Sequence, residues 1–119
     1  MPSTTTYRRG EVVVVSVPFS NQAGSKPRPA LVLSADSFHR GLPDVLVCAI
    51  SSQPRYHQRP GPGDVPLSHW QAGGLHHPST VRLSNLFSVE KTLIRYSLGT
   101  LHPADWARVE TGLRKAFGL

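Results

Sequence analysis

Residues 26–34, Lys-Pro-Arg-Pro-Ala-Leu-Val-Leu-Ser, decide how this chain folds. Proline fixes its own φ and restricts the residue before it, so Arg28, between Pro27 and Pro29, is held in an extended backbone. The apolar run that follows is typical of a buried β-strand and predicts one over residues 29–34. A rigidly mounted guanidinium at a strand entrance suits phosphate, because its planar fork binds oxyanions and stays charged.

Further segments have the composition of β-strands. They cover residues 11–17, 44–51, 64–67, 80–83 and 86–94. The apolar segment 44–51 should be buried on both faces of a sheet, whereas Pro66 restricts its own segment to a sheet edge. The last segment should be broken by a turn near Glu90. Residues 52–63, rich in proline and glycine, predict a long loop.

The end of the chain has the pattern of a helix. Pro103 suits the first helical position, Asp105 places an acid in the first turn, and Gly118 closes the helix. Apolar residues recur at spacings of three and four, at Trp106, Val109, Leu113 and Phe117. Many short strands followed by one helix predict a mainly β (α+β) fold, a small β-barrel with a C-terminal α-helix.

Size and charge limit the possible partners. The chain of 119 residues is long enough for one domain, expected over residues 8–119 behind a flexible polar leader at 1–7. Its formal net charge of +6 favours a partner rich in phosphate or carboxylate.

Composition argues against several other classes of protein. The single cysteine, Cys48, excludes a disulfide framework and stands where a small buried hydrophobic residue is expected. No apolar run approaches the length of a membrane span, and the first residues lack the apolar core of a signal peptide. We therefore expect a cytoplasmic protein without a membrane partner. No metal-ligand spacing is present, so neither a metal nor another cofactor is expected.

A second polar cluster, Ser51-Ser52-Gln53, follows the predicted strand 44–51 directly. If this strand ran antiparallel to the strand after Arg28, the end of one would lie beside the start of the other. Arg28 and Ser51 would then share one pocket. The alternative is that both serines only satisfy backbone groups of the loop.

Several motifs, taken together and in order, resemble the PemK/MazF family of toxins from type II toxin–antitoxin systems. They are residues 9–15 (RGEVVVV), 26–34 (KPRPALVLS), 49–53 (AISSQ), 74–83 (GLHHPSTVRL), 86–91 (LFSVEK) and 98–101 (LGTL). The resemblance extends from about Arg9 to the C-terminus.

The resemblance implies an SH3-like barrel that works as a homodimer. It implies a metal-independent, sequence-specific endoribonuclease that cuts single-stranded RNA, an mRNA interferase, and is inhibited by a cognate acidic antitoxin. In that family, the arginine before proline and a threonine or serine after the third strand form the catalytic pair. The matching residues here are Arg28 and Ser51.

The chemistry of RNA cleavage suits these residue types. Attack by the ribose 2′-OH needs negative charge stabilised on phosphorus, together with proton transfers to and from sugar oxygens. Some family members use an arginine and an aspartate of the later Val-Arg-Leu motif as acid and base. Arg82 matches that arginine, but Ser84 stands at the aspartate position, which favours a phosphate contact or a structural role for Arg82.

Other residues are candidates for catalysis or RNA binding. Ser52, Gln53 and His57 follow the strand that ends at Ser51, and His57 is the one histidine that we select as a possible acid or base. The others are expected at the surface and in turns, at His39, His69, His76, His77 and His102. The predicted loop 52–63 supplies cations and an aromatic ring suited to single-stranded RNA, at Arg55, Tyr56 and Arg59. Phe19, in the first loop of the chain, is a weaker candidate for contacting RNA.

Two alternatives share the predicted fold. One is a noncatalytic toxin that poisons a protein such as a topoisomerase, as CcdB-type toxins do, and the other is a nucleic-acid-binding module without toxicity. The pair Arg28 and Ser51 favours the ribonuclease, because a pure binder has no need of it.

Overall fold

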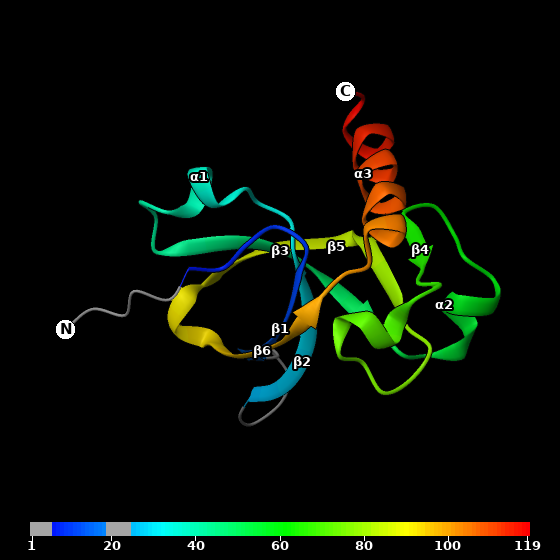
Figure 1. Ribbon diagram of the computed structural model, residues 1–119, viewed down its shortest axis with the longest axis horizontal. Coiled ribbons are helices and arrows are strands. Elements are labelled where there is room, and N and C mark those ends of the chain that lie inside the picture. Colours follow the sequence, from blue (N-terminus) through cyan, green and yellow to red (C-terminus); the bar gives the residue numbers. More distant parts are fainter. Residues whose placement is uncertain (1–5, 19–24) are drawn as a thin grey trace.

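The computed structural model describes residues 6–18 and 25–119, and in these it forms one six-stranded antiparallel sheet (Figure 1). The strand order is β4-β5-β3-β2-β1-β6. The elements are β1 (Glu11–Pro18), β2 (Ser25–Val32), α1 (Asp36–His39), β3 (Asp44–Ser51), α2 (Pro54–Gln58), β4 (Asp64–Pro66), η1 (Trp70–Gly73), β5 (Thr80–Glu90), η2 (Lys91–Leu93), β6 (Ile94–Thr100) and α3 (Pro103–Phe117).

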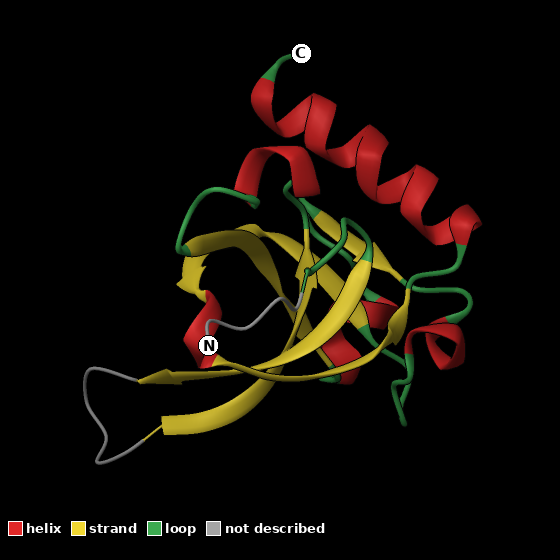
Figure 2. Cartoon of the chain, turned by 60° about the vertical axis from the view of Figure 1, so that its left-hand side comes forward, coloured by secondary structure: helices red, strands yellow, loops and turns green. Residues whose placement is uncertain are grey.

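The sheet is strongly curved, and α3 lies across one side of it (Figure 2). The edge strands β4 and β6 do not pair with each other, so the sheet has the curvature of a barrel without closing into one. The mainly β fold with a C-terminal helix is confirmed, and the barrel is an open one.

The sheet packs on both faces because its central strands are apolar throughout. Successive residues of a strand point to opposite faces, and in β2 Leu31 belongs to one buried cluster while Ala30 and Val32 belong to the other. In β3, Cys48 and Val47 divide in the same way, which confirms the prediction that this strand is buried on both faces. The Cys48 cluster lies beneath α3, and the Val47 cluster fills the curve between β1, β3 and β6.

Helix α3 has the predicted bounds and caps. Gly118 ends it with a left-handed φ of 69°, and Val109 is completely buried against the first cluster, with Trp106 and Leu113 partly buried beside it. Phe117 departs from the predicted stripe: it is 62% exposed, because the last turn extends past the sheet.

Three predicted elements need correction. Strand β2 begins at Ser25 and not at residue 29, since Lys26 and Arg28 already pair with β1. Residues 80–83 and 86–90, predicted as separate strands, form one strand, because a bulge against β3 absorbs the extra residues 83–85. The turn predicted near Glu90 is confirmed, since η2 follows β5 there. The loop 52–63 contains the helix α2, which starts at Pro54 in the first helical position.

His39 is buried, contrary to the expected surface position. Its Nδ1 lies 2.7 Å from Ser34 Oγ and its Nε2 lies 2.6 Å from the carbonyl oxygen of Tyr7. A carbonyl only accepts, so Nε2 carries a proton, and in the neutral ring Nδ1 then accepts from the serine hydroxyl. Tyr7, the last residue of the predicted leader, also packs against the second cluster, while residues 1–5 lie outside the described part.

No helix among residues 6–18 and 25–119 is both long and apolar enough to cross a membrane. Cys48 is completely buried, as predicted, and burial raises the pKa of its thiol to about 12.

The buried thiol predicts a loss of stability at high pH. An unfolded thiol ionises near pH 8.5, whereas the folded one stays protonated to about pH 12, so the unfolded state releases a proton first. Between these values the free energy of unfolding should fall by about 1.4 kcal/mol per pH unit more than it does in Cys48→Ala. Urea titrations at pH 8 and 10 measure this, and equal slopes for both proteins would contradict it.

Gly74 predicts a second, steric effect on stability. It has a φ of 80°, and a Cβ there would collide with the carbonyl of Leu98 on β6. Gly118 has a similar φ of 69° but open space around it. Gly118→Ala should therefore cost about 1 kcal/mol for backbone strain alone, and Gly74→Ala several times more. Chemical denaturation of both variants measures the difference, and similar losses would rule out the collision.

Candidate functional site

Most of the residues selected from the sequence line a single cavity of about 640 Å³. It lies where the pairing between β2 and β3 ends, and α2 and β5 complete its walls. Its lining is Val15, Arg28, Pro29, Ala49, Ile50, Ser51, Ser52, Gln53, Tyr56, Arg82, Asn85, Phe87 and Ser88.

The strand register explains why these side chains meet. Directly paired residues of neighbouring strands point to the same face of a sheet. Val15 pairs with Arg28, and Ala49 pairs with both Ala30 and Arg82, so these residues share one face. Arg28 lies two residues before Ala30, and Ser51 lies two residues after Ala49. Both therefore point to the same face.

The two prolines end the pairing between β2 and β3 at this point. The N–H of Leu33 donates to the carbonyl of Leu46 on β3. Backbone nitrogens of every second residue point to the same side of a strand, so the nitrogens of Pro29 and Pro27 also face β3. Neither proline has an N–H to donate. The paired register accordingly stops at Ala30 and Ala49, although β2 continues to pair with β1.

The position of Arg28 and Ser51 follows directly. Extending the register by two residues would place Arg28 opposite Ser51, in the part where the strands no longer pair. Arg28 is exposed and Ser51 is half-buried at the cavity wall. The antiparallel arrangement required for a shared pocket is therefore present.

The hydroxyl of Ser51 also has a backbone contact. Its Oγ accepts the N–H of Gln53 at 3.2 Å, which fixes the turn that leads into α2. A hydroxyl that accepts in this way still has a hydrogen to donate. Ser51 can thus hold the local backbone and donate to an anion in the cavity. Ser52 and Gln53 are exposed on the same wall.

Arg82 is held by a buried carboxylate that the sequence did not reveal. Its Nε donates to Asp64 Oδ1 at 2.8 Å, and the Asp64 side chain is only 3% exposed. This hydrogen bond raises the pKa of Arg82 above its ordinary value. Asp64 is the direct partner of Arg82 across β4 and β5, and its Oδ2 accepts the N–H of Gly61.

Tyr56 packs against two cations. The Arg82 guanidinium carbon lies 3.6 Å from the centroid of its ring, and that of Arg55 lies 4.7 Å away. Arg55 also donates to the Tyr56 hydroxyl at 2.8 Å. The ring therefore holds the Arg82 guanidinium at the cavity, whose lining does not include Arg55. Arg59, just after α2, is exposed.

His57 lies apart from these residues. Its Nδ1 lies 3.2 Å from the carbonyl of Ser79 and 3.4 Å from Thr80 Oγ1. It does not line the cavity of Arg28 but a second cavity on the other side of α2. The geometry thus separates His57 from Arg28 and Ser51. Phe19 lies outside the described residues.

Sequence reasoning missed Asp64 and the cavity residues Asn85, Phe87 and Ser88. The sequence places Asp64 only in a predicted edge strand, and its contact with Arg82 depends on the register between β4 and β5, which no local pattern gives. Asn85 and its neighbours enter the cavity through the bulge in β5, which shifts their register. Among residues 6–18 and 25–119 no cluster of His, Cys, Asp or Glu could hold a metal ion.

The chain is thus a small β protein with a curved antiparallel sheet, and arginines and hydroxyls line a cavity where the pairing of two strands ends. The model of the PemK-like, MazF-like toxins of type II toxin–antitoxin systems matches residues 8–117. The chain therefore belongs to this toxin family.

Solved structures have the same fold. An endoribonuclease from a mycobacterial species, in complex with its cognate antitoxin, is 22% identical with a TM-score of 0.77, over 95% of this chain and 96% of that one. A MazE–MazF complex from Deinococcus radiodurans is 22% identical with a TM-score of 0.75, over 97% and 99%. The Mycobacterium tuberculosis toxin MazF-mt6 is 21% identical with a TM-score of 0.72, over 92% and 97%. No curated protein matches the chain.

The Asp64–Arg82 pair predicts strong energetic coupling. Asp64 is buried, so removing either partner leaves a desolvated charge or a broken hydrogen bond. A double-mutant cycle with Asp64→Ala and Arg82→Ala should therefore give a coupling energy of about 1–3 kcal/mol. The exposed pair of Asp36 in α1 and Arg40, the residue that follows α1, is the control, with Arg40 Nη2 3.6 Å from Asp36 Oδ2. It should give less than about 0.5 kcal/mol. Urea unfolding measures both cycles, and equal couplings would contradict the structural role of Asp64.

Proposed function

We propose that this chain is the toxin of a type II toxin–antitoxin system and acts as a metal-independent, sequence-specific endoribonuclease on single-stranded RNA. The observation that carries the proposal is the shared cavity of Arg28 and Ser51 at the splayed ends of β2 and β3. Family membership and the endoribonuclease among the similar structures support it.

Arg28 and Ser51 have the chemistry to stabilise a phosphorane. In the proposed step, the ribose 2′-OH gives up its proton to solvent as its oxygen attacks the adjacent phosphorus, and the 5′-oxygen of the next nucleotide leaves and takes a proton from solvent. The products are a 2′,3′-cyclic phosphate and a 5′-OH end. Charge develops on the nonbridging oxygens, where a guanidinium and a hydroxyl donor stabilise it more than in the ground state. Among the described residues of the lining there is no carboxylate and no imidazole. Stabilisation of charge is therefore the main contribution of this wall.

Arg82 serves as a second cation for the RNA backbone. Asp64 and Tyr56 fix its guanidinium at the cavity, and a side chain that is already ordered loses less entropy when it binds a phosphate. Arg55 and Arg59 extend the positive charge along α2, which suits the backbone of a single strand.

The remaining features of the proposal concern partners and place. The net charge of +6 suits both RNA and an acidic antitoxin, and two of the similar structures are complexes with antitoxins. We place the active form in the cytoplasm as a homodimer, where a messenger RNA would be its substrate.

Cleavage assays with purified protein test the catalytic pair. Wild type should cut a long RNA in EDTA, leaving 2′,3′-cyclic phosphate and 5′-OH ends. Arg28→Ala should lower the rate about 100-fold or more, because it removes the charged donor, and Ser51→Ala should lower it less. Ser51→Thr should keep most of the activity, since it keeps the hydroxyl.

Matched controls come from α1 and the residue that follows it. Arg40→Ala and Ser37→Ala remove an exposed arginine and an exposed serine of the described chain outside the cavity, and both should cut like wild type. Intact RNA with wild type, or full activity in Arg28→Ala, would overturn the enzymatic function. Cleavage that stops in EDTA would overturn the metal-free mechanism. RNA binding without cleavage would favour a binding module.

A further inference from the structure

A second cavity, of about 790 Å³, lies on the opposite side of α2 from Arg28. Ser52 lines both cavities. Tyr56 of α2 faces the first, while His57 and Gln58 of the same helix line the second. Strand β4, the segment around η1 and the first turns of α3 complete its walls, through Leu67, Trp70 and Arg108 among others. The two cavities are therefore neighbours that meet at Ser52.

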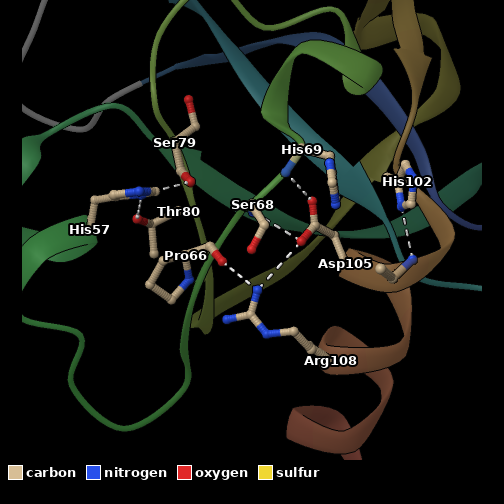
Figure 3. A network of polar contacts seen from close by, with 10 residues as sticks. His57, Pro66, Ser68, His69, Ser79, Thr80, His102, Asp105 and Arg108 are labelled. Carbon is tan, nitrogen blue, oxygen red and sulfur yellow. Dashed lines mark hydrogen bonds and ion pairs between the residues drawn. The ribbon is translucent and has the colours of Figure 1, made fainter.

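His57 has a defined tautomer in this cavity. The carbonyl of Ser79, 3.2 Å from Nδ1, can only accept, so Nδ1 carries the proton of the neutral ring (Figure 3). Thr80 Oγ1, at 3.4 Å, lies on the same nitrogen. Nε2 of the neutral ring then has a lone pair and can accept from an N–H on the edge of a base.

The opposite wall carries a rigidly positioned cation. Nη1 of Arg108 donates to the carbonyl of Pro66 at 2.7 Å and lies 3.4 Å from Asp105 Oδ1 (Figure 3). Asp105 is completely buried and also accepts the N–H groups of Ser68 and His69. Arg108 is thus fixed by β4 and α3, and a guanidinium has further N–H donors beyond those of Nη1.

Rings complete the chemistry of the cavity. Trp70 packs against the core, is only partly buried and lines the cavity. His77 is exposed at the same wall. Flat rings beside a hydrogen-bond acceptor and a cation are the groups with which proteins hold an unstacked base of single-stranded RNA.

We propose that this second cavity is a base-binding subsite for a nucleotide that flanks the cleaved phosphodiester. A single-stranded RNA that is bound at Arg28 and continues past Ser52 enters this second cavity directly. Trp70 and His77 stack the base, His57 Nε2 accepts from its edge, and Arg108 neutralises an adjoining phosphate. This inference rests on the proposed ribonuclease function and makes His57 a specificity residue rather than an acid or base.

The test uses short DNA oligonucleotides with a single ribonucleotide at the mapped cleavage site and an abasic residue at each flanking position in turn. With wild type, removal of one particular base should raise KM about tenfold or more, because stacking on a ring contributes about 1–3 kcal/mol per base. In His57→Ala, His77→Ala and Trp70→Leu, the same removal should change KM less than about twofold.

His76→Ala is the matched control. His76 is exposed beside His77 but does not line either cavity, so this variant should keep the full effect of the abasic position. Thermal unfolding of each variant separates loss of the subsite from loss of the fold. If Trp70→Leu does not fold, the two exposed or half-exposed histidines carry the test alone.

The outcomes distinguish the subsite from the ribonuclease. Cleavage by wild type with no sensitive flanking position, or with a sensitivity that survives in the variants, overturns the subsite and leaves the enzyme. If wild type does not cleave, the enzymatic proposal fails. The subsite is then tested by fluorescence anisotropy, which measures the binding of all-deoxy oligonucleotides with and without the abasic residue to wild type and to the same variants. Binding without that base dependence overturns the subsite.

Discussion

The site depends on the inability of proline to donate a hydrogen bond. The nitrogens of Pro27 and Pro29 face β3 but carry no hydrogen to donate. Strand β2 therefore keeps its pairing with β1 and loses its pairing with β3 beyond Ala30 and Ala49. The strands that build the core thereby separate at one end. Arg28 and Ser51 are the residues that this separation exposes to a common cavity.

Around this opening, the cations are ordered by contacts within the protein. Asp64 and Tyr56 hold Arg82, and Asp105 and Pro66 hold Arg108 on the far side of α2. In both cases a buried carboxylate orients a partly exposed guanidinium, so the charge that faces solvent is already positioned. The short helix α2 contributes to both cavities, with Tyr56 lining one and His57 the other.

Local sequence patterns predicted what depends on local forces. Three elements have patterns that lie in consecutive residues: the valine run of β1, the apolar run of β3, and the helix α3 with Pro103 and Gly118 at its ends. Their predicted bounds agree with the observed ones to about one residue. Long-range register was not accessible in this way. The bulge in β5 and the pairing of Asp64 with Arg82 depend on which strands meet, and His39 is buried because Ser34 and the Tyr7 carbonyl satisfy its nitrogens. The resemblance to a toxin family, and not the residue pattern alone, gave the pairing of Arg28 with Ser51 its functional meaning.

The end of the β2–β3 pairing also separates what keeps the chain folded from what would make it active. Arg28 is exposed and stands beyond the last hydrogen-bonded pair of these strands, while the core lies among Val12, Leu31 and Cys48 and their neighbours. A chain that has lost this arginine keeps the packing that defines its shape. Under the proposed function, such a copy would not cut RNA, and it would still occupy an antitoxin that binds away from this cavity. In a cell that also makes intact toxin, such a copy would compete for the same inhibitor and release active molecules.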